Sequence, residues 1–300
     1  MVPDMTTVWP TSPVNAQLSR SLIGAFLGHV TDPVAGTSDP TRLRCDGRTV
    51  FIMSEIRPRV RVLGPIDVVT AGGAVSVGGH QPRALLGALV LSAGHAVPID
   101  RLRWVLWGDD PPGAGDATIQ SYVSHLRHLL GPDVILLTDH SYEIDATKVD
   151  IDAVLFERSF RQAANAQDEP ERCWQLSREA LGLWRGRPFG ELADDEEFTI
   201  ETHRLEQLRL ATMELNMEAD VMLGRTKSVI GELEATVKEQ PYREHLWWLL
   251  IRALAEEGRR VEALRRCEDL RRCLAEVGIG VGPEVAKLER EILAGEEIRG

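Results

Sequence analysis

One thirteen-residue stretch constrains this chain most, because its apolar residues all fall on one side of a helix. Residues 118–130 read TIQSYVSHLRHLL, with apolar residues separated by four, three and four positions, which is one stripe along an α-helix. The other side carries short polar and protonatable side chains, which suit a helix lying in the major groove of DNA. Taken alone, the pattern is more often that of a helix with one buried and one solvated face. The stripe consists of Ile119, Val123, Leu126 and Leu130.

The segments around this helix predict a small domain of three helices and two pairs of strands. An apolar run of helical length precedes it and ends at Gly94, and a shorter helix follows that run. Short β-type runs lie on either side of the Gly72-Gly73 turn and of a polar turn at residues 139–141. Strands, three helices and a hairpin, in this order, predict a winged helix-turn-helix. The helices are expected at residues 82–93, 98–107 and 118–130, and the strands at 59–63, 75–77, 134–138 and 142–144.

The second half of the chain is helical throughout. Gly, Pro or polar breaks separate seven candidate helices. Small residues at Ala253, Ala255 and Ala263 favour closely packed antiparallel pairs, stacked like tetratricopeptide repeats. Trp174, Trp184, Trp247 and Trp248 are expected to pack between helices. The helices are predicted at residues 152–166, 171–184, 196–224, 227–240, 242–257, 261–277 and 283–294.

Two sets of motifs resemble one known family. The segments RVRVLGPIDV, HQPRALLGALVLSAGHAVPIDRLRWVLWGDDPP and ATIQSYVSHLRHLLG resemble the OmpR-type DNA-binding domain of the Streptomyces antibiotic regulatory proteins. The segments GLWRGRPFGEL and QPYREHLWWLLIRALAEEGRRVEALRRCEDLRRCLAEVGIGVGPEVAKLEREIL resemble the bacterial transcriptional activation domain of the same proteins. The resemblance extends over about residues 57–293. It implies a mainly α protein with little β structure, in which a winged helix-turn-helix domain precedes an all-α tetratricopeptide-like domain.

The resemblance also implies a domain organisation and a set of partners. Residues 57–150 would bind double-stranded promoter DNA, at direct repeats overlapping the −35 region. Residues 151–300 would serve self-association on DNA and contact with RNA polymerase holoenzyme. The target would be a secondary-metabolite (antibiotic) gene cluster, and the protein would act in the cytoplasm, at the nucleoid. The Pro-rich residues 1–56 are expected to be mostly disordered, either as a regulatory arm or because the translational start lies downstream, near Met53.

Matching the recognition helix position by position assigns individual contacts. Ser121 and His125 are the candidate base readers, and Asp139 and Glu143 in the wing replace the Arg that is common in the family. His125 and His128 also stand where Arg is common. The acidic residues in the wing and the histidines in the helix each reduce the expected attraction for phosphate. The full set of candidate DNA-binding residues is Trp107, Thr118, Gln120, Ser121, Tyr122, Ser124, His125, Arg127 and His128, of which Trp107, Thr118, Tyr122, Ser124 and Arg127 would contact phosphates.

The charge balance supports a rival hypothesis. The formal net charge is −12, and residues 57–150 hold eight Arg or Lys against ten Asp or Glu, so the candidate DNA domain is not basic. The alternative is therefore a helical protein-interaction or ligand-sensing module whose winged helix no longer binds DNA strongly. The polar side of residues 118–130 argues against that alternative.

Enzymatic, metal-binding and membrane-spanning functions find little support in the sequence. There is no GxxxxGK[ST], GxSxG or HExxH motif, and the four cysteines show no ligand spacing. The acidic run at residues 194–197 is interpreted as a solvated helix start, where the helix dipole favours carboxylates. No apolar run reaches the roughly 18 residues that a bilayer requires, and no signal peptide is expected. We therefore expect no catalytic residues, no cofactor, no metal and no membrane association.

Overall fold

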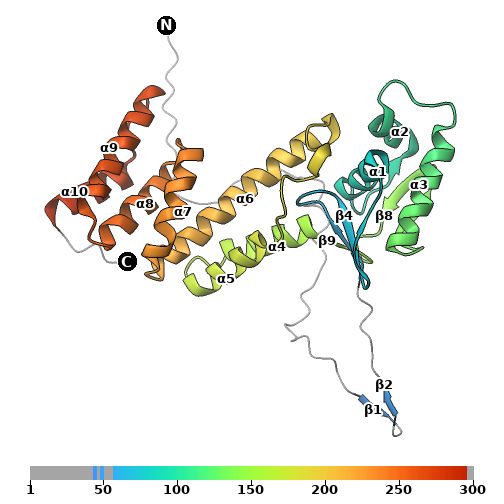
Figure 1. Cartoon of the computed structure of the whole chain (residues 1–300), viewed down its shortest axis with the longest axis horizontal. Helices are drawn as coiled ribbons and strands as arrows, with labels where there is room; N and C mark the ends of the chain where they lie inside the picture. Colours follow the sequence, from blue (N-terminus) through green and yellow to red (C-terminus); the bar gives the residue numbers. More distant parts are fainter. Residues whose placement is uncertain (1–42, 46–47, 51–56, 296–300) are drawn as a thin grey trace. The chain divides into compact units, whose positions relative to one another are not determined.

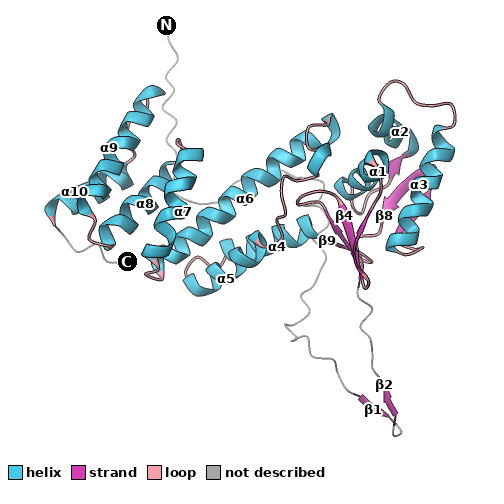
Figure 2. Cartoon of the chain, viewed as in Figure 1, coloured by secondary structure: helices cyan, strands magenta, loops and turns pink. Residues whose placement is uncertain are grey.

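The computed structural model describes residues 43–45, 48–50 and 57–295, and most of these residues are helical (Figures 1 and 2). The chain forms two compact units whose segments alternate in the sequence. The first unit contains the residues before 156 together with 185–204, and the second contains 156–184 and the residues after 204. The domain boundary expected after residue 150 stays a prediction.

Most of residues 1–56, for which disorder is expected, lie outside the described residues. The described exceptions are two short strands, β1 (Leu43–Cys45) and β2 (Arg48–Val50), which pair antiparallel. The expectation of disorder is thus not tested over most of this segment.

The first unit contains two further small sheets. In the four-stranded sheet the order is β5-β4-β3-β9, with β3 antiparallel to β4 and parallel to β9. The sequence analysis missed β4 because its residues, DVVT, do not alternate between apolar and polar, and it missed β9 because two residues show no pattern. These strands are β3 (Arg59–Arg61), β4 (Asp67–Thr70), β5 (Gly73–Ser76) and β9 (Asp150–Ile151).

Three helices pack with these strands, and Figure 1 shows α1, α2 and α3 beside β4 and β8. They are α1 (His80–Leu91), α2 (Ile99–Trp107) and α3 (Gly115–Leu130). The expected helices are confirmed, but α1 begins two residues before Pro82. Pro82 fits there because the N–H groups of a helix's first turn have no acceptor within the helix, so the missing N–H of proline costs no hydrogen bond. The apolar stripe of α3 is confirmed: each of its four residues is at most 4% exposed.

The third sheet forms the wing. Its order is β6-β8-β7, with β6 (Val97–Pro98), β7 (Ile135–Thr138) and β8 (Ser141–Ile144). Asp139 and His140 connect β7 to β8, both with positive φ (45° and 58°), as a two-residue hairpin turn requires. The strand order leaves β7 as an edge strand.

Residues 185–204 belong to the first unit because they pack against its core. The backbone N–H groups of Arg185 and Phe189 donate to the carbonyls of Leu63 (2.8 Å) and Val62 (2.7 Å). Phe198, at the start of α6 (Glu196–Met222), is fully buried, and its ring would lie 2.7 Å from a Cβ built on Gly87. So close an approach of α6 to α1 requires glycine at position 87.

Asp152, the first residue of α4 (Asp152–Ala164), is buried in the same region. Its carboxylate accepts hydrogen bonds from the N–H groups of Val62 (2.7 Å) and Leu63 (3.1 Å), and Arg185 Nη2 lies 3.8 Å away. Burial outweighs these partners and raises the pKa of Asp152 to about 6.

The raised pKa predicts a pH-dependent contribution to stability. Between pH 4 and 7 the unfolded chain loses the Asp152 proton before the folded protein does, so ionisation of this group costs stability as pH rises. We expect the free energy of unfolding of the parent, relative to that of Asp152→Asn, to fall over this range by up to about 3 kcal/mol. Urea denaturation of both proteins at several pH values measures the difference. A difference that grows in favour of the parent as pH rises would show that the hydrogen bonds outweigh burial.

The second unit consists of stacked helices. Its remaining helices are α5 (Pro170–Leu181), α7 (Thr226–Glu239), α8 (Glu244–Glu256), α9 (Arg260–Glu276) and α10 (Pro283–Ala294). Together with α4 and α6 they confirm the seven expected helices. The largest difference between a predicted and an observed helix end is at α5, which ends three residues before the predicted end at Trp184. In the described part of the chain, no helix is both long and apolar enough to cross a membrane.

Helix α8 lies at the centre of this stack. It packs against α7, α9 and α10, and residues of α6 to α10 share one core cluster. Ala253 and Ala263 are fully buried in it, which lets neighbouring helices approach closely. The four tryptophans are buried or half-buried: Trp247 donates to Pro241 O, Trp248 packs on the core cluster, and Trp174 and Trp184 lie beneath Arg side chains.

Candidate nucleic-acid interface

The side of α3 opposite the buried stripe is exposed and polar. We call Gln120, Ser121, Ser124, His125 and His128 the outer face; all five are exposed. Ser121 and His128 lie most directly opposite the stripe, with Ser124 and His125 on either side of them, as the helical spacing requires. Burial of Ile119, Val123, Leu126 and Leu130 therefore fixes which side chains α3 presents to solvent.

Most side chains of the outer face have no partner among the described residues. The side chains of Gln120, Ser121, Ser124 and His128 form no hydrogen bond or ion pair there, so their donors and acceptors are available to a ligand. His125 differs, because its Nε2 lies 3.2 Å from the carbonyl oxygen of Val77. A carbonyl only accepts, so Nε2 is the donor in this contact.

Trp107, Thr118 and Tyr122 are half-buried candidates that flank the outer face and contact protein groups. The Tyr122 hydroxyl donates to Gln81 Oε1 (2.7 Å), and Thr118 Oγ1 donates to the carbonyl of Ala114 (3.1 Å). Trp107, the last residue of α2, lies against the start of α3, 3.5 Å from a Cβ built on Gly115. These contacts hold α1, α2 and α3 in one arrangement.

Arg127 contacts the wing in this structure. Its Nε and Nη2 both donate to the carbonyl oxygen of Ile135 in β7, at 2.9 and 2.7 Å. The side chain therefore satisfies an acceptor on the outer edge of β7. That Arg127 contacts a phosphate stays a prediction, and so does each of the other assigned DNA contacts.

The wing itself offers little positive charge. Residues 135–144 contain no Arg or Lys, and Asp139 lies in the turn. Leu136 and Leu137 are exposed on β7 (38% and 56%). Tyr142 is buried, and burial raises the pKa of its hydroxyl. The chemistry of the wing thus favours apolar or neutral contacts over phosphate binding.

Nearly every cation in the described part of the first unit is already paired. Of the Arg and Lys side chains at residues 57–155 and 185–204, all but Arg57 and Arg127 lie within 4.0 Å of a carboxylate. Binding to phosphate would therefore exchange internal ion pairs for intermolecular ones.

Some of these carboxylates come from a segment that the sequence analysis did not connect with the interface. Glu191 pairs with Arg83 (3.0 Å), Asp195 lies 3.6 Å from His80, and Glu197 pairs with Arg101. The acidic run at residues 194–197 was the available signal. Its interpretation as a solvated helix start is correct for the first residue of α6, but the partners could not be identified without the fold.

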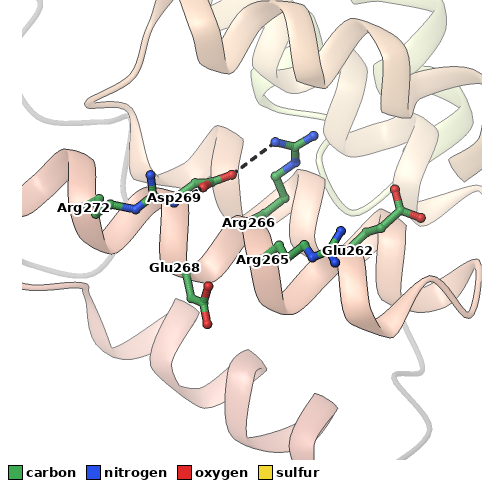
Figure 3. Close-up of a pocket in the computed structure, with 6 residues that line it drawn as sticks. All are labelled: Glu262, Arg265, Arg266, Glu268, Asp269 and Arg272. Atoms are coloured by element: carbon green, nitrogen blue, oxygen red, sulfur yellow. Dashed lines mark hydrogen bonds and ion pairs between the residues drawn. The ribbon is translucent and has the colours of Figure 1, made fainter.

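The second unit has a charged surface hollow on α9 (Figure 3). Arg266 pairs with Asp269 (3.2 Å) and with Glu234 of α7 (2.8 Å), and Arg272 pairs with Asp269 (2.6 Å). These ion pairs neutralise Arg266 and Arg272 within the hollow. Within the described residues, no three His, Cys, Asp or Glu side chains lie where they could hold a metal ion. The lining residues are Glu262, Arg265, Arg266, Glu268, Asp269 and Arg272.

Comparison with known proteins identifies related regulators. The bacterial transcriptional activator domain family matches residues 151–293. Regulatory protein DnrI of Streptomyces peucetius is 30% identical over 249 residues, which are 78% of this chain and 92% of DnrI. Regulatory protein AfsR of Streptomyces griseus is 35% identical over 246 residues, which are 80% of this chain and 25% of AfsR. The chain thus spans about a quarter of the length of that relative.

A solved structure has the same fold. The structure of Mycobacterium tuberculosis EmbR in complex with a low affinity phosphopeptide aligns with a TM-score of 0.72 and 30% sequence identity. The alignment covers 81% of this chain and 66% of that one. The relatives are named as regulatory proteins and not as enzymes.

Proposed function

Because the chain belongs to the Streptomyces antibiotic regulatory protein family of transcriptional regulators, we propose that it activates transcription by binding promoter DNA through the outer face of α3. The observation that carries this proposal is the unpaired, exposed polar surface of Ser121, Ser124 and His128 above a fully buried stripe. Short hydroxyl and imidazole groups on a rigid helix can read base edges in the major groove.

The finer parts of the proposal follow from the family resemblance. The operator would consist of direct repeats overlapping the −35 region, and the helical domain would serve self-association and contact with RNA polymerase. The regulated genes would form a secondary-metabolite cluster. The protein would act in the cytoplasm, on the nucleoid.

The paired cations of the first unit favour cooperative binding. The described residues of the first unit offer little unpaired positive charge for phosphate, so a second protomer bound alongside would supply the missing affinity. Protomers side by side would read half-sites about 10–10.5 bp apart, on the same face of the duplex.

We therefore expect the full chain to bind paired half-sites cooperatively and to lose that cooperativity when about five base pairs are inserted between them. The operator is first obtained by selecting bound fragments of the source genome and footprinting them. Equilibrium titrations then compare the natural spacing, the half-turn insertion and a full-turn insertion of about ten base pairs. The full-turn insertion is the control, because it returns the two half-sites to the same face of the duplex. Equal affinity at natural and half-turn spacing would contradict assembly on DNA.

A second candidate function remains specific enough to test. The scarcity of unpaired cations at residues 57–155 and 185–204 also fits a module in which the winged helix serves protein contacts or ligand sensing. The same fragment selection decides between the two. Recovery of no enriched sequence by the folded protein would favour the interaction module.

A further inference from the structure

The N-terminal end of α1 borders the outer face of α3. Two contacts define this border: His125 Nε2 lies 3.2 Å from the Val77 carbonyl, and the Tyr122 hydroxyl donates to Gln81. A helix in the major groove has a phosphate strand along each flank. If α3 binds as proposed, the flank that carries Tyr122 and His125 brings one strand toward residues 77–81.

Arg83 is held at that border. Its Nε donates to the carbonyls of Gly78 (2.9 Å) and Gly79 (3.3 Å), in the loop that precedes α1. Its Nη1 lies 3.0 Å from Glu191 Oε1, in the 3-10 turn η2 (Gly190–Leu192). The Arg83 side chain is 25% exposed and that of Glu191 49%, so solvent reaches the pair and an incoming anion could replace the carboxylate.

A second pair repeats the arrangement next to it. His80, the first residue of α1, lies 3.6 Å from Asp195, and both side chains are about half exposed. The 185–204 segment therefore places carboxylates against cationic or protonatable groups at two neighbouring positions beside the outer face.

We propose that Arg83 is a phosphate-binding residue of the DNA interface and that Glu191 occupies its guanidinium in the unbound protein. DNA then competes with Glu191 for Arg83, and the competition lowers the affinity for every duplex equally. Sequences that make good base contacts offset this loss, whereas other sequences do not. The inference rests on the proposed DNA-binding function and adds a residue and a competing carboxylate to it.

The test is a double-mutant cycle in the full-length protein with a duplex of arbitrary sequence at low salt. Glu191→Gln removes the carboxylate that competes with DNA for Arg83. We expect it to raise affinity about 3–10-fold, because partly exposed ion pairs and charges at the rim of an interface contribute only modestly. Glu196→Gln is the matched control, because it removes the same charge from the same segment and Glu196 has no ion pair among the described residues. It should change affinity less than Glu191→Gln does.

Two results would identify Arg83 as the phosphate-binding residue for which Glu191 competes. The gain from Glu191→Gln should vanish in an Arg83→Gln background, and Arg83→Gln should reduce the slope of log affinity against log salt by about one. Arg83→Lys keeps the charge and should keep the slope, which separates charge loss from any loss of structure at the loop. Thermal unfolding of each variant checks that it is folded.

The outcomes separate this inference from the proposed function. A gain that persists in the Arg83→Gln background, or that equals the gain of the control, would overturn the inference alone. Binding without any sequence preference would contradict the proposed function, yet the cycle would still decide the role of Arg83. Failure of every variant to bind any duplex would overturn both.

Discussion

Phe198→Ala is expected to lower the free energy of unfolding by about 3–5 kcal/mol. Phe198 is fully buried, its ring centroid lies 5.1 Å from that of Phe189, and it fills the space that glycine leaves at position 87. Truncation removes this packing and leaves a cavity between α1 and the start of α6. The size of the effect would show that residues 185–204 are part of the folded first unit.

Urea denaturation followed by circular dichroism measures the change. Ile200→Ala is the control, because Ile200 lies two residues further along α6 and is 82% exposed; it should change stability by less than about 0.5 kcal/mol. Phe198→Leu should give an intermediate loss. Similar small effects for Phe198→Ala and Ile200→Ala would mean that the segment does not pack against α1 in solution.

The helices could be predicted from the sequence because each depends on its own residues. The stripe from Ile119 to Leu130 fixed the inward side of α3, and Gly and Pro breaks placed the bounds of the second-unit helices to within a few residues. The resemblance added the winged-helix topology. Strands β4 and β9 were not predicted, because such short strands are determined by the strands they pair with and not by their local sequence pattern.

Tertiary contacts account for what the sequence could not provide. Nothing local indicates that Phe198 packs on Gly87, or that Asp152 accepts hydrogen bonds from residues 89 and 90 positions away. For the same reason, no local pattern indicates that Arg127 donates to the Ile135 carbonyl. A position-by-position match assigns a residue to a face of a helix, whereas the partners of its side chain depend on the surrounding fold.

Ser121→Glu is expected to lower DNA affinity about 100-fold or more at fixed salt. Ser121 lies at the centre of the outer face, is exposed and has no partner among the described residues. A carboxylate there would face base acceptors and phosphates, and juxtaposed like charges at an interface cost several kcal/mol, of which each 1.4 kcal/mol is tenfold in affinity. Folding should be unaffected, because the side chain points to solvent.

The matched control places the same substitution away from α3. Ser228 is exposed in the first turn of α7, where a carboxylate is favourable to the helix dipole. Ser228→Glu changes the net charge by the same amount as Ser121→Glu. The difference between the two variants therefore isolates the position of the charge from its effect on the whole protein.

The most direct test of the proposed interface is the equilibrium dissociation constant of the parent, Ser121→Glu and Ser228→Glu for one selected operator duplex at one salt concentration. The proposal predicts that Ser121→Glu binds at least about 100-fold more weakly than the parent, while Ser228→Glu stays within a few-fold of it. Equal affinities for the two variants, with both proteins folded, would contradict the placement of the outer face of α3 in the DNA groove.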